Sequence, residues 1–187
     1  MPQSLFFGFC IVLFVVVFLG CSSVEQQEIL PSEADPLGVL YTDSAALSCL
    51  PNDAPREEAS VVDVIDGDTI GVEINKRRYR VRYIGIDTPE TSAQIEYFGN
   101  EATERNRFLV ENRKVILIKD ISETDRYGRL LRYVLVGDVF VNYELVRGGY
   151  AKAYTYPPDI ACADIFRETE RQAHQEHLGL WTETPMP

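Results

Sequence analysis

The sequence predicts an α+β fold whose core is a small barrel or a strongly curved sheet, with helices packed on it. Two observations carry this prediction. Short stretches rich in β-branched and aromatic residues, separated by turn residues, come first in the region after residue 60. Segments with helical periodicity fill the gaps between later strands and close the chain. Short strands followed by helices favour an α+β arrangement.

The elements follow in order along the chain. Five strands are expected over 61–65, 69–75, 78–86, 114–119 and 130–136, with a hairpin turn at 137–138 into residues 139–140. Helices are expected over 98–112, 141–147 and 160–177. In the third strand Arg78, Arg80 and Arg82 share one face. Three arginines on one strand face are unusual for a core and suit a surface that binds anions.

The first twenty residues have a different character. Residues 5–19 form an almost unbroken apolar run of fifteen residues, followed by Gly20 and Cys21. A spanning helix needs ~20 residues, so the length better suits the apolar region of a secretory signal. The end of the run resembles a bacterial lipoprotein signal, in which Cys21 would be lipidated. An uncleaved anchor and an ordinary secretory signal are the alternatives. All three predict an extracytoplasmic protein, either a cell-envelope lipoprotein or a secreted one.

An acidic, flexible tether is expected over 21–59. It holds eight acidic residues and one basic residue, a net charge of −7, and neither helical nor strand periodicity persists in it. The remaining residues carry only −4 of the total charge of −11. The sequence therefore predicts a signal over 1–20, the tether, one folded domain over 60–183 and a short tail over 184–187.

Four cysteines are present. Cys10 lies in the apolar run and Cys21 is the candidate lipid site, which leaves Cys49 and Cys162. In an oxidising compartment two remaining cysteines predict a disulfide. Such a bridge would close a long loop and would be worth up to ~4–5 kcal/mol in the chain-entropy model. Two unrelated buried thiols are the alternative.

Carboxylates cluster in two short motifs. Asp68 follows a tight turn and Asp87 ends a strand, so the flanking strands could bring them together. Carboxylate oxygens beside a backbone carbonyl suit Ca²⁺ or Mg²⁺, and no Cys or His cluster offers a zinc site. With Glu90 and nearby arginines, this set matches what phosphodiester hydrolysis requires. The alternative for each aspartate is a turn residue, and that is the role expected for Asp66.

Several motifs occur together in a fixed order. They are VIDGDT, VRYIGIDTPE, DRYGR, NYELVRGGYAKAYTY and a terminal GLW. In this order and spacing they resemble the staphylococcal nuclease (thermonuclease) family from about residue 61 to residue 183. The resemblance implies the OB-fold of that family, a five-stranded β-barrel with about three packed helices.

The resemblance also implies roles for individual residues. Ca²⁺ would be bound by Asp68, Asp87 and the backbone carbonyl of Thr88. Glu90 matches the glutamate usually drawn as the general base for the attacking water. Two arginines would grip the scissile phosphate through planar, two-pronged donation. They are Arg82 and Arg129, and Arg129 would also assist the leaving oxygen.

The DRYGR and AKAYTY motifs contain the residues that the resemblance implies in substrate binding. Tyr127 and Tyr154 match tyrosines that contact the terminal phosphate or stack near the nucleotide. Arg126 keeps the positive charge of a family lysine. Asp125 is expected to cap the DRYGR turn, and Tyr156 is expected to pack rather than to contact substrate.

The function implied is a Ca²⁺-dependent nuclease with little sequence preference. It would cut DNA and RNA by in-line attack of water, leave 3′-phosphates, act as a monomer, and be held at a membrane by Cys21 or an N-terminal anchor. One alternative is an OB-fold module that binds single-stranded nucleic acid without cutting it. Another is a surface lipoprotein with a structural Ca²⁺ site. The mildly acidic domain predicts weak non-specific binding that depends strongly on salt.

Overall fold

The fold is taken from a computed structural model of the chain, which describes residue 42 and residues 44–91 and 96–182. The apolar run, the candidate lipid site at Cys21 and the C-terminal tail lie outside these residues. The segment Val39–Pro187 forms one compact unit. Within the described ranges, no helix combines the length and the apolar character needed to cross a membrane.

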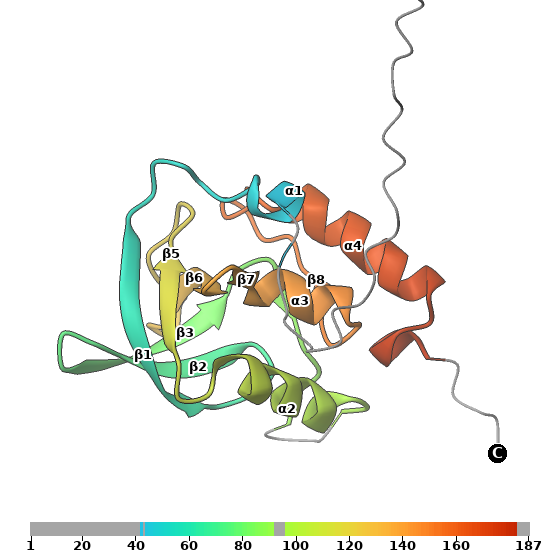
Figure 1. The fold of residues 1–187 in the computed structure, drawn as a ribbon, viewed down its shortest axis with the longest axis horizontal. Coiled ribbons are helices and arrows are strands. Elements are labelled where there is room, and N and C mark those ends of the chain that lie inside the picture. Colours follow the sequence, from blue (N-terminus) through green and yellow to red (C-terminus); the bar gives the residue numbers. More distant parts are fainter. Residues whose placement is uncertain (1–41, 43, 92–95, 183–187) are drawn as a thin grey trace, which may run out of the picture. The chain divides into compact units, whose positions relative to one another are not determined.

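A closed five-stranded barrel forms the core of the domain, which confirms the predicted fold class (Figure 1). Neighbouring strands pair in the order β3-β2-β1-β5-β6, and a parallel pairing of β3 with β6 closes the barrel. A two-residue strand, β7 (Val139–Phe140), continues antiparallel from β6. The barrel strands are β1 (Arg56–Val64), β2 (Thr69–Ile74), β3 (Arg77–Tyr83), β5 (Lys114–Ile118) and β6 (Leu130–Val136).

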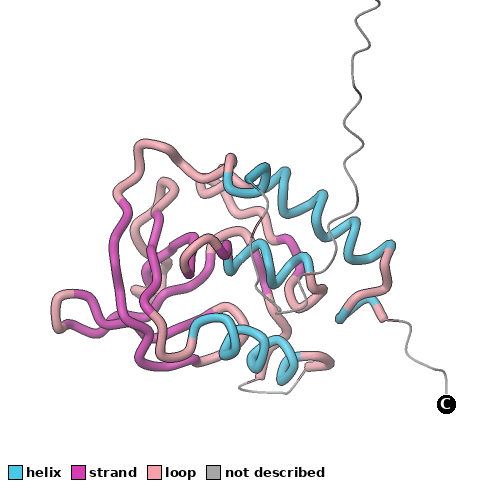
Figure 2. The backbone as a smooth tube through the Cα atoms, viewed as in Figure 1, coloured by secondary structure: helices cyan, strands magenta, loops and turns pink. Residues whose placement is uncertain are grey.

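Helices and a second, two-stranded sheet complete the domain (Figure 2). The second sheet pairs β4 (Ile86–Asp87) with β8 (Lys152–Ala153), and a single 3₁₀ turn (η1, Gly179–Trp181) ends the described chain. The helices are α1 (Ser44–Leu47), α2 (Gly99–Val110), α3 (Val141–Arg147) and α4 (Ala163–Gln175).

Two expected boundaries differ most from those observed. The single strand expected over 78–86 is split into β3 and β4, because Gly85 has a left-handed φ of 78° that turns the chain. The first strand begins at Arg56 rather than at residue 61, since residues 56–60 pair with β5. Residues 44–59, which the composition places in the tether, therefore include a helix and the start of the barrel.

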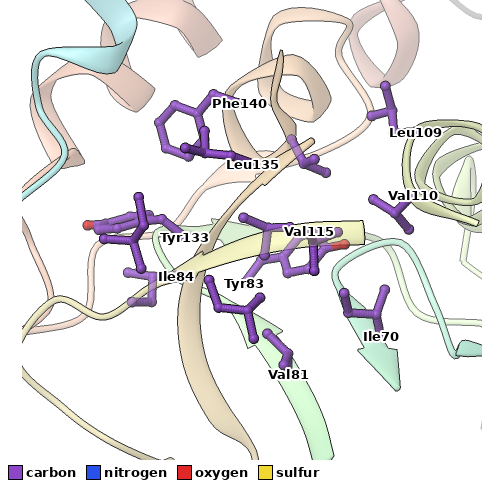
Figure 3. Packing of buried hydrophobic residues seen from close by; sticks show 14 of the residues in the cluster. Ile70, Val81, Tyr83, Ile84, Leu109, Val110, Val115, Tyr133, Leu135 and Phe140 are labelled. Atoms are coloured by element: carbon purple, nitrogen blue, oxygen red, sulfur yellow. The ribbon is translucent and has the colours of Figure 1, made fainter. Parts of the chain in front are cut away.

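Apolar side chains from every barrel strand fill the interior (Figure 3). Ile70, Val81 and Val115 are buried there; Val81 and Val115 alternate with more exposed neighbours on their strands, whereas both neighbours of Ile70 are buried as well. Tyr83 is also buried, and its hydroxyl donates to Oδ1 of Asn106 on α2 at 2.9 Å. This contact holds α2 against the barrel wall near the end of β3, where the carboxylate motifs begin.

Asn142 connects the core to the turn between β3 and β4. It is fully buried on α3. Its Oδ1 accepts the backbone N–H of Val134 at 2.9 Å, and its Nδ2 donates to the carbonyl of Ile84 at 3.0 Å. Each backbone group would otherwise be buried without a partner. Asn142 therefore fixes the position of the chain that leads into Asp87.

Replacing Asn142 with alanine is expected to lower the free energy of unfolding by about 2–4 kcal/mol, because two buried backbone groups lose their partner and a cavity remains. Urea denaturation followed by circular dichroism measures the loss. Asn100→Ala, at an exposed position on α2, is the matched control and should change stability by less than about 0.5 kcal/mol. Equal stability of the two variants would contradict this role.

Candidate active site

The Asp-Gly-Asp turn brings one carboxylate against the chain that follows β4. Oδ1 of Asp66 accepts the backbone N–H of Asp68 at 3.0 Å, so Asp66 is a turn former, as expected. A Cβ atom at Gly67 would lie 2.7 Å from Oγ1 of Thr88. Glycine is therefore required here for steric reasons, because only an absent side chain lets the turn reach Thr88.

Asp68 is almost completely buried and richly hydrogen-bonded. Its Oδ2 accepts the backbone N–H of Thr88 at 2.9 Å and the hydroxyl of the same residue at 3.1 Å. Its Oδ1 accepts the hydroxyl of Thr69 at 3.1 Å. Burial raises the pKa of Asp68 to about 7, against the opposing charge of Arg82. A second positive charge here would hold this carboxylate ionised.

Arg82 joins the two candidate metal ligands. Its Nη1 lies 3.0 Å from Oδ2 of Asp68, and its Nη2 lies 2.7 Å from Oδ1 of Asp87. Nη1 also donates to the carbonyls of Tyr83 at 3.0 Å and Ile86 at 2.8 Å. The guanidinium thus holds the carboxylates from β3–β4 and the Asp-Gly-Asp turn side by side. In this arrangement it pairs with carboxylates that are candidate cation ligands.

The donor set fits a hard cation. Asp68, Asp87 and the backbone of Thr88 offer only oxygen atoms, which is the chemistry that Ca²⁺ and Mg²⁺ prefer. Among the residues that the structure describes, no three His, Cys, Asp or Glu side chains gather in a group that could hold a metal. Two carboxylates and a carbonyl would thus leave several coordination positions to water, a pattern common for these ions.

The DRYGR turn presents Arg129. Oδ1 of Asp125 accepts the backbone N–H groups of Tyr127 at 2.9 Å and Arg129 at 3.0 Å, so Asp125 caps the turn as expected. Its Oδ2 accepts from Nε of Arg129 at 2.6 Å. Burial opposes the ionisation of Asp125, but these hydrogen bonds together lower its pKa. The two terminal nitrogens of Arg129 make no hydrogen bond to any described residue, which leaves them available to an anion.

Exposed aromatic rings stand around this arginine. The guanidinium of Arg129 lies 5.6 Å from the ring centroid of Tyr127, and that of Arg126 lies 4.7 Å from it. Tyr154 and Tyr156 stack on each other with centroids 6.3 Å apart and planes 10° apart. Both are more than half exposed. Large exposed rings of this kind favour stacking with a planar partner such as a nucleobase.

One cleft of about 530 Å³ joins these groups. Its lining brings together five of the predicted site residues, namely Arg82, Arg126, Tyr127, Arg129 and Tyr154. The candidate metal ligands adjoin it through Arg82. Glu90 is exposed, lies three positions beyond Asp87 and is not among the lining residues.

Tyr156 also lines the cleft, which contradicts the expectation that it only packs. The sequence offered a signal for it, because residues two apart in an extended segment share one face, as Tyr154 and Tyr156 do. Asp159 is a second residue that sequence reasoning missed. It is buried, and its Oδ1 accepts the backbone N–H groups of Ile121 at 2.9 Å and Ser122 at 2.7 Å. It thereby joins the two loops that border the cleft.

Comparisons with known proteins find similarity to nucleases. A family model described as staphylococcal nuclease homologue matches residues 80–183. The chain is 35% identical over 142 residues to the thermonuclease of Staphylococcus hyicus, covering 74% of this chain and 82% of that protein. It is 35% identical over 132 residues to the thermonuclease of Staphylococcus intermedius, covering 69% and 79%. It is 39% identical over 125 residues to endonuclease YncB of Bacillus subtilis (strain 168), covering 64% and 59%.

Proposed function

The chain belongs to the staphylococcal nuclease family, and from this premise we propose that it is a Ca²⁺-dependent nuclease with little sequence preference. It hydrolyses phosphodiester bonds of DNA and RNA and leaves 3′-phosphates. The names of the relatives, thermonuclease and endonuclease, support a nuclease. The oxygen-only donor set of Asp68, Asp87 and Thr88 supports a hard cation such as Ca²⁺.

One observation carries the proposal more than any other. Arg129 is held by Asp125 at the cleft, and its terminal nitrogens make no hydrogen bond within the described part of the chain, while Arg82 reaches the same cleft between two carboxylates. Fixed donors aimed at the place where charge develops are the main requirement for phosphoryl chemistry. The stacked Tyr154 and Tyr156 supply a platform for a base beside them.

Glu90, Arg129 and the cation have different proposed roles in the reaction. A water oxygen bonds to phosphorus and one proton of that water passes to a base, the role proposed for Glu90. The bond between phosphorus and the 5′ oxygen breaks, and the departing oxygen takes up a proton. Arg129 stabilises the charge on the phosphate oxygens and assists that departing oxygen. A cation held by Asp68, Asp87 and Thr88 would supply Lewis-acid polarisation of the phosphate.

The proposed substrate-binding groups line the same cleft. Tyr127 and Arg126 are proposed to contact a terminal phosphate, since their side chains meet at 2.5 Å on the exposed DRYGR turn. Tyr154 and Tyr156 are proposed to stack on a base. None of these contacts reads the pattern of donors and acceptors on a base edge, which supports low sequence preference.

We also propose that the enzyme works outside the cytoplasm, as a monomer, in the cell envelope or secreted. The disulfide between Cys49 and Cys162 supports an oxidising compartment. The apolar run and Cys21 support a lipoprotein-type signal, and both lie outside the described residues. Labelling cells with a radioactive fatty acid, and comparing the wild-type chain with Cys21→Ala, tests the lipid anchor.

The nuclease proposal is tested by digesting single-stranded DNA with the full-length chain in mild detergent, with Ca²⁺ or with excess chelator. Short 3′-phosphorylated products are expected only with Ca²⁺. Asp87→Asn, which removes the charge of a half-exposed candidate ligand, should raise the Ca²⁺ concentration needed for half-maximal rate by about tenfold or more. Asp164→Asn on α4 is the matched control for an exposed aspartate paired with an arginine.

Three outcomes separate the alternatives. DNA that remains bound and uncut, with or without Ca²⁺, would overturn the enzyme and favour a binding module. A Ca²⁺ effect on melting temperature alone would favour a structural cation site. Cleavage that resists chelation, or an unchanged Ca²⁺ requirement in Asp87→Asn, would contradict the metal assignment.

A further inference from the structure

Strand β3 carries a basic surface outside the cleft. The hairpin formed by β2 and β3 holds five basic residues and one acidic residue, Glu73, in a chain whose net charge is −11. Its tip projects from the barrel, at the left of Figure 1. Four of the basic side chains are exposed: Lys76, Arg77, Arg78 and Arg80.

None of these four side chains forms an ion pair with a residue that the structure describes. Arg78 lies directly opposite Glu73 across the hairpin, yet the two make no ion pair. By contrast, seven other arginines do pair with a carboxylate: Arg82, Arg107, Arg129, Arg132, Arg147, Arg167 and Arg171. A set of unpaired cations in an acidic protein is a place where a polyanion would gain charge pairing without displacing an existing partner.

Two of the four extend the cleft. Val81 and Tyr83 are buried in the barrel, so Arg78, Arg80 and Arg82 share the outer face of β3 by alternation. Arg82 lines the cleft. In the parallel pairing of β3 with β6, Val81 lies opposite Leu130. Arg80 comes one residue before Val81, and Arg129 comes one residue before Leu130. Arg80 therefore neighbours both cleft arginines, and Arg78 lies one step farther out.

We propose that Arg80 and Arg78 form an extended binding site for the sugar–phosphate backbone of a nucleic-acid strand, beyond the scissile phosphate. The occupant is the part of a single strand that leaves the cleft along β3. Residues two apart on a strand are separated by about 6.5 Å, a repeat close to that of phosphates along an extended single strand. The row formed by Arg78, Arg80 and Arg82 thus offers one arginine to each successive phosphate. Arginine suits phosphate because it can donate two hydrogen bonds at once.

This inference rests on the nuclease function proposed above and adds a substrate class to it. The enzyme would favour polynucleotides over dinucleotides, because only a longer strand reaches Arg80 and Arg78. Phosphate contacts carry no sequence information, so the preference is for length and not for sequence.

The test compares a dinucleotide with a single-stranded oligonucleotide of about twelve nucleotides, cut by the full-length chain in detergent. Arg78→Ala/Arg80→Ala is expected to raise KM for the longer strand about tenfold at low salt. The slope of log KM against log salt concentration should decrease by about 1.4, which corresponds to two lost phosphate contacts. The rate on the dinucleotide should change by less than about twofold, since its phosphate stays within the cleft.

Arg77→Ala/Arg113→Ala is the matched control. It removes the same charge, from the other face of β3 and from an exposed position just before β5. It should leave KM for both substrates and the salt dependence unchanged. If this control reproduced the effect, net charge rather than the row would be responsible, and the proposal would be overturned.

The outcomes also separate this proposal from the nuclease function. A wild-type protein that cuts neither substrate contradicts the nuclease. A wild-type protein that cuts both, with the same KM for the long strand in Arg78→Ala/Arg80→Ala, contradicts the extended site alone. Normal melting temperatures for both double variants are required, and they are expected because all four side chains are exposed and form no ion pair with a described residue.

Discussion

Replacing Arg129 with alanine is expected to lower kcat on single-stranded DNA by about 10²–10³-fold, the usual cost of removing one fixed donor from a developing charge. Arg129 is held at Nε by Asp125, and its two terminal nitrogens face no described partner. A donor that is already oriented needs no reorganisation as negative charge grows on the phosphate. Because that charge is larger in the transition state, kcat and kcat/KM should fall together.

The control must remove an arginine from a similar ion pair. Arg171 pairs through Nε and Nη2 with Glu168 on the exposed face of α4. Arg171→Ala should leave kcat within about twofold of wild type, since an exposed pair contributes little to stability. If kcat of Arg129→Ala also stayed within about twofold of wild type, Arg129 would not contact the reacting phosphate. A loss confined to KM would make it a binding residue only.

Local motifs in the sequence predicted much of this site. The Asp-Gly-Asp and DRYGR segments are short turns whose hydrogen bonds join residues at most four apart. The roles of Asp66 and Asp125 follow from that local chemistry. Most barrel strands were predictable for a similar reason, because short runs rich in β-branched and aromatic residues between turn residues are a local signal.

Contacts between distant segments were not predictable. The bridge that Arg82 makes between Asp68 and Asp87 depends on how β3, β4 and the Asp-Gly-Asp turn meet in space. Strands β4 and β8 have two residues each, too few for any periodicity, although their pairing places Tyr154 beside the cleft. The start of β1 was not predictable for another reason. Its first three residues, Arg56, Glu57 and Glu58, are charged, and what holds them is backbone pairing with β5.

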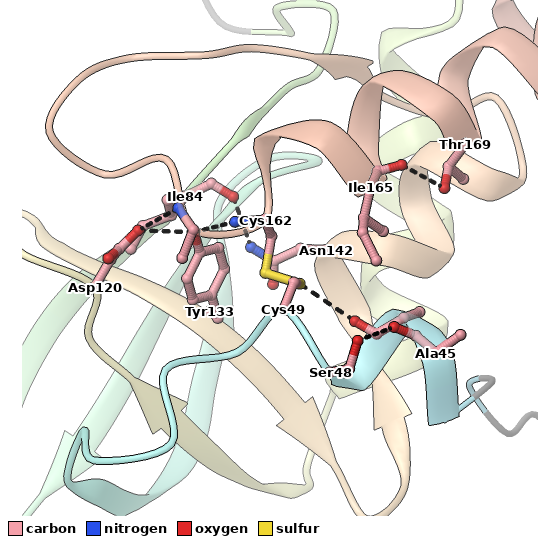
Figure 4. Close-up of a disulfide and its surroundings, with 12 residues drawn as sticks. Ala45, Ser48, Cys49, Ile84, Asp120, Tyr133, Asn142, Cys162, Ile165 and Thr169 are labelled. Carbon is pink, nitrogen blue, oxygen red and sulfur yellow. Dashed lines mark hydrogen bonds between the residues drawn. A yellow bond between two sulfur atoms is a disulfide. The ribbon is translucent and has the colours of Figure 1, made fainter.

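Removing the disulfide is expected to lower the free energy of unfolding by about 3–5 kcal/mol. Cys49 and Cys162 are bonded across a sequence separation of 113 residues, as the sequence predicted (Figure 4). In the chain-entropy model a loop of this length restricts the unfolded chain strongly. For a domain of this size the melting temperature should fall by about 10–15 °C. Calorimetry on the full-length chain in detergent measures the fall.

Two variants separate the bridge from the packing of its sulfur atoms. Cys162 is completely buried where α4 begins, whereas Cys49 is half-buried. Cys49→Ala breaks the bridge and keeps the buried sulfur in place. Cys49→Ala/Cys162→Ala breaks the bridge and also leaves a small cavity. If the covalent link is responsible, the single variant loses most of the stability and the double variant loses only about 1 kcal/mol more.

The same bridge joins α1 to the start of α4, which lie side by side in Figure 1, and α4 follows the loop that carries Tyr154 and Tyr156. Without it, Thr42 and residues 44–50 are held against the rest of the domain by non-covalent contacts, among them the hydrogen bond from the backbone N–H of Phe140 to Oγ1 of Thr42 at 2.7 Å. Limited proteolysis should therefore cut this segment faster in Cys49→Ala while the barrel stays intact. Equal protection of the segment and an unchanged melting temperature would show that the non-covalent contacts alone hold α1 in place.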